Sequence, residues 1–232
     1  MQVEIWSDIM CPFCYIGKRR FEAALAQFDH ANDVQVVWKS FQLDPALKTD
    51  PDQDVYQYLV ENKGVTREQA IAMNQQVTEM AREVGLDYHL DQAVLANSFD
   101  AHRLIQLARQ HNLGDAAEER LFYAYFTEGA NIADRPTLVK LGEEIGLAAP
   151  SITRMFETGT LVKEVEEDIR EAQQLGARGV PFFVIDRQYG ISGAQPTDVF
   201  LSTLTQAHQK IAEASARSTA SEGDTCAVDG SC

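Results

Sequence analysis

The stretch QVEIWSDIMCPFCYIGKRRF, residues 2–21, contains the strongest structural and chemical signals of this 232-residue chain. Its first six residues alternate as a half-buried strand does. The cysteine motif Cys11–Cys14 (CPFC) follows, and apolar side chains then recur at helical spacing up to Phe28. Pro12 suits the first position of that helix, because its missing N–H would have no partner inside the helix. The stretch predicts a strand that ends before the cysteines and a helix that begins at them.

Further strands are predicted on either side of a long helical region. Residues 34–43 (VQVVWKSFQL) are rich in β-branched and aromatic side chains, which favours a buried second strand. A strand, a helix and a second strand form a βαβ unit, in which the two strands run parallel. Strand character returns at residues 182–186 (FFVID), and a turn, a short partner strand and a last helix from Pro196-Thr197 follow. The chain order is therefore βαβ, a block of helices and then ββα.

The region between these two parts predicts helices only. We expect residues 1–50 and 161–214 to form one sheet domain and residues 51–160 to form an inserted all-helical domain. Residues 215–232 are rich in Ser, Ala, Gly and Asp, which predicts a flexible tail. The expected helices cover residues 54–62, 66–84, 97–111, 115–127, 135–146 and 160–175.

Charge and composition restrict the function. The formal net charge of −15 argues against nucleic acid or an anionic membrane as a partner, because both require clustered Lys and Arg. No apolar segment is long enough to span a bilayer, and the N-terminal residues lack the pattern of a signal peptide. We therefore expect a cytoplasmic protein, in which paired cysteines are more often catalytic, redox-sensing or metal-binding than structural.

The position of the first cysteine pair indicates thiol chemistry. A helix N-terminus presents unpaired N–H groups and partial positive charge, which stabilise a thiolate on Cys11. Cys14 lies one turn deeper and can attack a mixed disulfide held on Cys11. The alternatives are an inert pair or half of a zinc site, which needs further ligands. Cys226 and Cys232 could supply them, but their five-residue spacing fits a zinc knuckle poorly, so we expect no metal and no cofactor.

Five ordered blocks of the sequence resemble the DsbA-like thioredoxin family. The chain is similar in particular to the cytoplasmic FrnE-type branch, which is related to 2-hydroxychromene-2-carboxylate isomerases. This resemblance covers roughly residues 1–213 and implies an α/β protein with a thioredoxin fold and an inserted helical domain. It also implies a cis Val180–Pro181 bond beside the cysteine pair, although a proline at a strand start has a purely structural reading. The blocks are Asp8–Gly17, Trp38–Pro45, Asn97–Leu104, Ala177–Phe183 and Ile191–Gln195.

Two departures from the relatives bear on activity. DsbA carries a histidine inside its cysteine motif, whereas Phe13 here has neither a hydrogen-bond donor nor a charge, so we expect a weaker oxidant than DsbA. The isomerases place serine where Cys11 stands and depend on glutathione. Cys11 together with Cys14 favours redox chemistry. A glutathione-dependent isomerase or transferase acting on a small aromatic stays open as an alternative, as does a thiol-dependent holdase or redox sensor.

The expected reaction is thiol–disulfide exchange through a mixed disulfide, with Cys11, Cys14 and Pro181 as the catalytic residues. The expected partners are protein or small-molecule thiols and disulfides, together with a cellular reductant such as thioredoxin or glutathione. Backbone groups beside Pro181 would pair with an extended substrate. The residues expected to bind the substrate are Pro12, Phe13, Val180 and His102.

Three further readings from the sequence stay open. His102 is either a substrate-binding or tuning residue, or a helix histidine satisfied by a neighbour. Asp8 and Lys39 are candidates for proton handling near Cys14, or solvated charges at strand ends. Cys226 and Cys232 form either a second redox pair that exchanges with Cys11–Cys14 or a pair of idle surface thiols.

Overall fold

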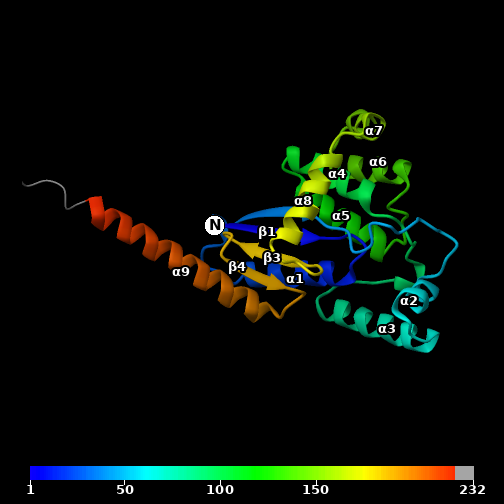
Figure 1. Cartoon of the computed structure of the whole chain (residues 1–232), viewed down its shortest axis with the longest axis horizontal. Coiled ribbons are helices and arrows are strands. Elements are labelled where there is room, and N and C mark those ends of the chain that lie inside the picture. The colour runs from blue at the N-terminus through cyan, green and yellow to red at the C-terminus, as the bar shows by residue number, and fades with distance from the viewer. Residues whose placement is uncertain (223–232) are drawn as a thin grey trace, which may run out of the picture.

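A mixed four-stranded sheet forms the centre of the protein (Figure 1). The computed structural model describes residues 1–222, with side chains up to residue 214. The strand order is β2-β1-β3-β4, with β1 at Gln2–Ser7, β2 at Gln35–Ser40, β3 at Phe182–Ile185 and β4 at Tyr189–Ser192. β1 pairs parallel with β2 and antiparallel with β3, and β3 pairs antiparallel with β4. The expected thioredoxin fold is thereby confirmed.

The central strand β1 is buried on both faces, because each face is covered by helices. Val3 and Ile5 belong to a core that also includes apolar residues of helix α1 (Pro12–Leu25) and helix α9 (Thr197–Glu222). Trp6 points to the other face, where it lies in a small cluster with Ala172 of helix α8. The period-2 alternation of a strand places these residues on opposite faces. Helix α1 provides the crossover that a parallel β1–β2 pair requires.

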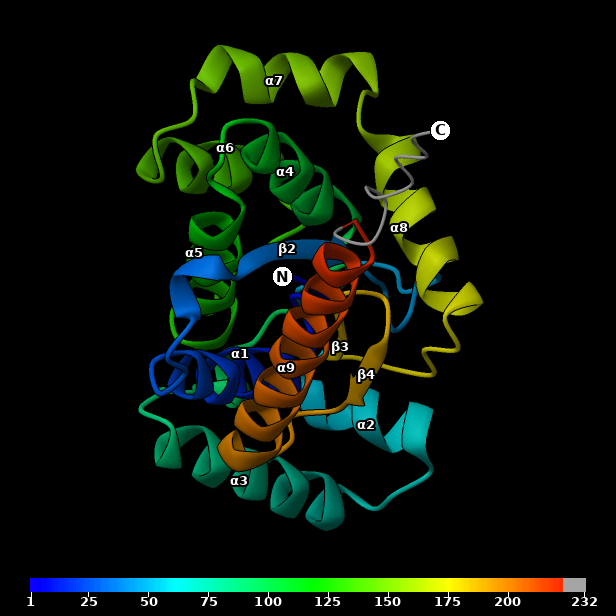
Figure 2. The ribbon, with the colours of Figure 1, turned by 90° about the vertical axis from the view of Figure 1, so that its left-hand side faces the viewer.

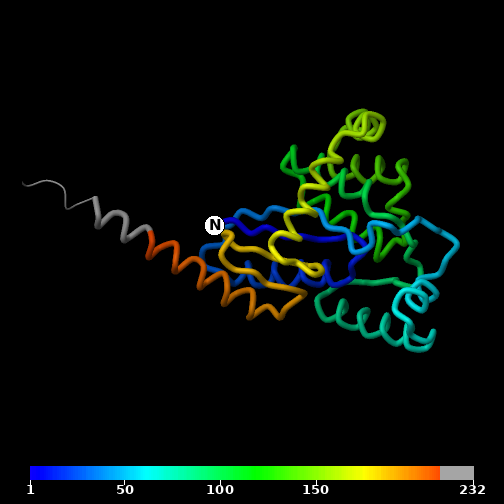
Figure 3. The backbone as a smooth tube through the Cα atoms, in the orientation of Figure 1, coloured from blue at the N-terminus to red at the C-terminus, as the bar shows by residue number. Residues whose placement is uncertain are grey.

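Seven helices follow β2 and precede β3, and Figure 3 traces this long excursion of the chain. Figures 1 and 2 show α4 to α8 on one side of the sheet and α2 and α3 on the other, next to α1. The seven are α2 (Val55–Lys63), α3 (Arg67–Glu83), α4 (Phe99–Gln110), α5 (Gly114–Phe126), α6 (Arg135–Glu144), α7 (Ala149–Thr158) and α8 (Val162–Gln174). Short 3-10 helices lie at η1 (Ala31–Asp33) and η2 (Leu90–Gln92).

The helices between β2 and β3 share their largest apolar core with the cysteine motif. Cys11, Cys14 and Tyr15 lie in one cluster with residues of α4, α5, α6 and α7, such as Leu104 and Phe122. The start of α1 is therefore packed between the sheet and these helices. Residues far from the motif in sequence set the burial and polarity around the two thiols.

One expectation about the helices is wrong. The sequence predicts no helix between residues 146 and 160, with Pro150 as a break, yet α7 occupies Ala149–Thr158 with this proline in its first turn. The signal was present in Ile152, Met155 and Phe156, which are buried at i, i+3 and i+4 spacing. The six helices that were expected lie within two residues of their predicted ends.

The C-terminal helix is longer than its composition suggests. Helix α9 continues to Glu222, whereas a flexible tail was expected from residue 215. The Ala, Ser and Glu residues in this stretch are compatible with a helix, and it contains no Gly or Pro to stop one before residue 223. The possible second redox pair, Cys226 and Cys232, lies outside the described residues. Within residues 1–222, no helix has the length and hydrophobicity needed to cross a membrane.

Candidate active site

Cys11 lies at the N-terminus of α1, where its backbone caps the helix. Its φ and ψ of −88° and 110° are extended, and Pro12 takes the first turn of the helix, as expected. The amide of Cys11 donates to the carbonyl of Asp8 at 2.9 Å, which closes the turn between β1 and the helix. No side chain caps α1, so the partial positive charge of the first turn lies next to the Cys11 thiol. The Cys11 sulfur thereby lies at the positive end of the helix.

The loop before β3 lies directly against the first cysteine. The Val180–Pro181 peptide bond is cis, and the Cys11 thiol donates to the Val180 carbonyl with an S···O distance of 3.5 Å. Gly17 lets helix α1 approach this loop, because a Cβ atom at Gly17 would lie 2.9 Å from Cγ of Pro181. The two motifs that the sequence singles out, 169 residues apart, therefore meet at one point.

The two cysteines occupy different environments. Both are free thiols, and both are buried in the resting structure. Burial raises the pKa of the Cys14 thiol well above its ordinary value, and the nearby Cys11 raises it further. Cys14 therefore keeps its proton at neutral pH. Cys11 thus lies at the start of the helix, and Cys14 is the deeper of the two thiols.

A buried carboxyl group from α5 lies behind the cysteines. Glu118 is fully buried, and its Oε2 accepts from the Ser7 hydroxyl at 3.5 Å. Its Oε1 has no partner among the described residues. Burial raises the pKa of Glu118 to about 8, against the opposing attraction of Lys18. Ser7 also acts on Cys14, because its hydroxyl lowers the pKa of that thiol. Ser7 thus lies between Cys14 and Glu118.

Sequence reasoning missed Glu118, although α5 carries a signal. Glu118 occupies the same helix stripe as Leu121, Phe122 and Tyr125, at i, i+3, i+4 and i+7. All four residues are buried. A carboxyl group in the middle of an apolar stripe is either paired or functional, because burying it alone is costly.

Asp8 holds the loop that leads to the cysteines. Its Oδ1 accepts from the amide of Met10 at 3.3 Å, and its Oδ2 accepts from the amide of Leu43 at 2.7 Å. Asp8 is 1% exposed, and Nε2 of His102 lies 3.5 Å from its Oδ1. Asp8 thereby ties the approach to Cys11 to the segment after β2.

The structure corrects two of the sequence interpretations. His102 is 0% exposed, so its ring cannot touch a bound substrate in this structure, and it lies behind Asp8 instead. Lys39 pairs with the carboxylates of Asp168 and Glu171 at 2.8 and 2.9 Å. The Lys39 side chain therefore faces α8, which covers that side of the sheet.

The accessible residues beside Cys11 are apolar. Phe13 is 38% exposed, and Pro12 and Val180 are half-buried. Leu43, on the loop that Asp8 holds, is 51% exposed. Pro181 itself is buried. Three of the residues expected to bind the substrate, Pro12, Phe13 and Val180, are therefore at least partly exposed next to Cys11.

Tyr88, which the sequence analysis also missed, holds the backbone of the cysteine motif by a hydrogen bond. Its hydroxyl donates to the carbonyl of Pro12 at 2.7 Å, and its side chain is buried. The ring stacks on Phe126 of α5 with a centroid distance of 4.6 Å. A segment of the helical region, between α3 and η2, thus holds the backbone inside the CxxC motif.

Replacing Tyr88 by phenylalanine is expected to lower the free energy of unfolding of the reduced protein by about 1 kcal/mol. The ring and its stacking are kept, and only the hydrogen bond to Pro12 is lost. Urea unfolding followed by circular dichroism measures the change. Tyr123→Phe is the matched control, because Tyr123 is 45% exposed on α5. Equal stability of the two variants would contradict the assignment.

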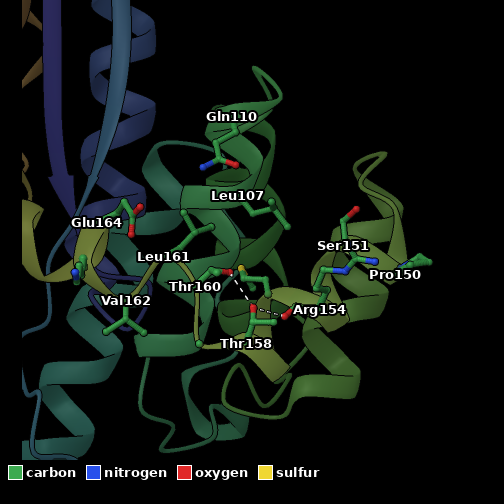
Figure 4. A pocket seen from close by; sticks show the side chains of 13 residues that line it. Leu107, Gln110, Pro150, Ser151, Arg154, Thr158, Thr160, Leu161, Val162 and Glu164 are labelled. Atoms are coloured by element: carbon green, nitrogen blue, oxygen red, sulfur yellow. Dashed lines mark hydrogen bonds between the residues drawn. The ribbon is translucent and has the colours of Figure 1, made fainter.

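A cavity of about 900 Å³ lies away from the cysteines, between α4, α7 and α8. Figure 4 shows Leu107 of α4 on one side and Arg154 of α7 on another, with Thr158 hydrogen-bonded near the turn to α8. Leu161, at the start of α8, also lines it. The cavity contains none of the residues that surround Cys11, so it is separate from the candidate active site.

A CxxC pair at the start of α1, a facing cis-proline loop and a four-stranded mixed sheet define a thioredoxin-fold protein with a dithiol site. The model of the family described as DSBA-like thioredoxin domain matches residues 2–205. The chain belongs to this family, whose DsbA-type members are thiol–disulfide oxidoreductases.

Comparisons with known proteins agree with this assignment. The chain is 29% identical over 215 residues to the uncharacterized protein YwbO of Bacillus subtilis (strain 168), covering 90% of this chain and 98% of YwbO. It is similar to the probable DsbA oxidoreductase SCO1869 from Streptomyces coelicolor, with a TM-score of 0.84 and 39% identity over 100% of this chain and 94% of that one. The cytosolic disulfide reductase DsbM from Pseudomonas aeruginosa shares the fold, with a TM-score of 0.64 and 20% identity over 90% and 100% of the chains.

Proposed function

We propose that the protein is a thiol–disulfide oxidoreductase in which Cys11 attacks and Cys14 resolves. The observation that carries the proposal is the asymmetry of the two thiols. Cys11 lies at the helix N-terminus in contact with the Val180 carbonyl, whereas burial keeps Cys14 protonated. Membership of the DSBA-like family and the 39% identity to a probable DsbA oxidoreductase support it.

The reaction proceeds in two exchange steps. The Cys11 thiolate attacks one sulfur of a substrate disulfide, so the substrate S–S bond breaks, a mixed disulfide forms, and the first substrate thiolate leaves. Cys14 then loses its proton and attacks the Cys11 sulfur, which forms the Cys11–Cys14 disulfide and releases the second substrate thiolate. Two electrons pass from the protein to the substrate, and the reverse sequence oxidises a substrate dithiol.

The proton on Cys14 needs an acceptor in a buried site. The Ser7 hydroxyl and the Glu118 carboxyl lie on the inner side of Cys14 and form a path away from the thiol. A carboxyl group whose pKa is about 8 exchanges its proton readily near neutral pH. In this proposal the ionised fraction of Glu118, which grows as the pH rises toward 8, takes up the proton as Cys14 attacks.

The substrate side of the proposal rests on the apolar surface beside Cys11. Pro12, Phe13 and Val180 would contact the chain that carries the disulfide, and backbone groups next to Pro181 would pair with it as an added strand. Protein or small-molecule disulfides are the proposed substrates, and thioredoxin or glutathione is the proposed reductant. The DsbM neighbour has been solved with GSH and is called cytosolic, in line with a reductive role in the cytoplasm.

Oxidised glutathione in excess is expected to convert the reduced protein to a Cys11–Cys14 disulfide. Mass spectrometry should show the loss of two hydrogens, with the crosslink mapped to the peptide that contains both residues. The oxidised protein should regain its thiols with reduced glutathione or thioredoxin and reduce a protein disulfide over many turnovers. A pair that stays reduced under excess oxidant would overturn the proposal, as would glutathione-dependent isomerisation of a small aromatic without any exchange.

A further inference from the structure

Two histidines and an aspartate that lie far apart in the sequence meet on the surface next to α9. His30 precedes the 3-10 helix η1, Asp33 ends it, and His208 lies on α9. The rings of His30 and His208 stack with a centroid distance of 3.8 Å and an interplanar angle of 13°. Both rings pack edge-on against Phe28, at 5.7 and 5.8 Å. Phe28 thus fixes the place where the two histidines come together.

The potential ligand atoms of this cluster lie close to one another. One nitrogen from each histidine and one carboxylate oxygen of Asp33 all lie within 4.8 Å of each other. In a tetrahedral Zn²⁺ site two ligand atoms lie ~3.3–3.6 Å apart, because each bond is ~2.0–2.2 Å long. The separations between the three atoms therefore need to shorten by at most about 1.5 Å for them to share an ion.

The stacked rings require one adjustment. Parallel imidazoles aim their nitrogens along parallel directions, so one ring must turn about its Cβ–Cγ bond to share an ion with the other. That torsion has a broad energy profile in histidine. The side chains of His30 and Asp33 are 49% and 68% exposed, so the solvent side leaves room for such a turn.

The two imidazoles and the carboxylate favour a divalent transition-metal ion. Imidazole suits Zn²⁺, Ni²⁺ and Cu²⁺, and a carboxylate completes a mixed N/O ligand set. Nδ1 of His30 lies 3.9 Å from Oδ2 of Asp33. The N-terminal ammonium bonds the backbone oxygen of Asp33 at 2.9 Å and not its carboxylate. The carboxylate is therefore available to a metal ion.

We propose that His30, Asp33 and His208 form a surface site for one divalent transition-metal ion such as Zn²⁺ or Ni²⁺, with water in the remaining positions. The site lies at the start of β1, whereas Cys11 follows its end, so about 20 Å of strand separates them. Bound metal joins the segment before β2 to helix α9 and takes no part in thiol exchange. The site does not depend on the proposed function.

Calorimetry on the full chain tests the site once thiol ligands are removed. All four cysteines, Cys11, Cys14, Cys226 and Cys232, are replaced by serine, and Zn²⁺ and Ni²⁺ are titrated separately. We expect one ion per chain and a metal-dependent rise in the melting temperature, because an ion that binds only the folded state stabilises it. Failure to bind either ion would overturn the proposal.

Matched histidine variants locate the ion. His30→Ala and His208→Ala should each weaken binding at least about tenfold, because loss of even an outer partner of a metal ligand costs 10–100-fold. His111→Ala is the control, because His111 is an exposed histidine at the end of α4 and does not belong to the cluster. This variant should bind the ion as tightly as the four-serine parent does. Equal affinities in all three variants would show that the ion binds elsewhere.

A spectroscopic measurement does not depend on the stability of the variants. In the four-serine chain, substoichiometric Cu²⁺ should broaden the backbone amide signals of residues 30–33 and of residues near His208 before any others. Broadening confined to a different part of the chain would overturn the assignment to His30, Asp33 and His208.

Discussion

Replacing Cys11 by serine is expected to reduce disulfide turnover by at least about a thousandfold. A serine hydroxyl stays protonated at neutral pH even at a helix N-terminus, so no nucleophile remains. The substitution changes one atom at a position that is 3% exposed, so the fold should be retained. Reduction of a protein disulfide, coupled to glutathione or thioredoxin, measures the loss, and circular dichroism checks the fold.

Cys14→Ser is the companion variant, and it should accumulate a mixed disulfide with the substrate instead of losing the first reaction step. Cys11 can still attack, but nothing resolves the mixed disulfide, so the substrate stays attached and is detected by mass spectrometry. A chain in which only Cys226 and Cys232 are serine should keep the single-turnover reaction of Cys11. If Cys11→Ser retained the covalent adduct and Cys14→Ser lost it, the two roles would be reversed.

The candidate reactive cysteines can be predicted from the sequence because their signals are local. The motif that contains Cys11 and Cys14 follows a strand and opens a helix, and both can be recognised from the neighbouring sequence. The sheet could be anticipated for the same reason, since β1 and β2 flank a helix of the length a parallel crossover needs. The role of Pro181 could be expected only through the family resemblance, because the contact of its neighbour Val180 with Cys11 spans 169 residues.

The supporting residues could not be found in this way, because their roles depend on which helices pack around α1. Glu118 and Tyr88 are ordinary residues of a helix and a loop until α5 and the segment after α3 are placed against the cysteine motif. His102 shows the opposite error. Its block matched the family, but the match does not say whether the ring faces the solvent or the core, and here it is fully buried.

Glu118→Gln is expected to remove a pH dependence of stability that the wild-type protein shows between about pH 5 and 8. Burial raises the pKa of Glu118 from its ordinary value of 4.5 to about 8. The folded protein therefore binds this proton more tightly than the unfolded chain does. The resulting stability is fully present below pH 4.5 and is lost as the pH rises through about 8. The difference corresponds to about 5 kcal/mol, at ~1.4 kcal/mol per pH unit.

Glutamine is neutral at every pH and has nearly the same shape, so the variant should keep its free energy of unfolding through this range. Near pH 5 we expect the two proteins to differ little, and near pH 8.5 we expect the variant to be more stable by about 3–5 kcal/mol. Urea unfolding of the reduced proteins from pH 5 to pH 9 measures the difference. Parallel curves for wild type and variant would show that Glu118 does not carry the raised pKa.

The neighbouring residue Glu119 supplies a control, because its pKa is shifted in the direction opposite to that of Glu118. Burial works against its ionisation, but hydrogen bonds from Arg19 and Tyr15 hold the pKa of Glu119 below its ordinary value. Its contribution is therefore present above that ordinary value and is lost as the pH falls. Glu119→Gln should lose stability at neutral and alkaline pH, where Glu118→Gln gains it. Since both residues lie on α5, opposite responses would separate the effect of burial from any general effect of removing a charge from this helix.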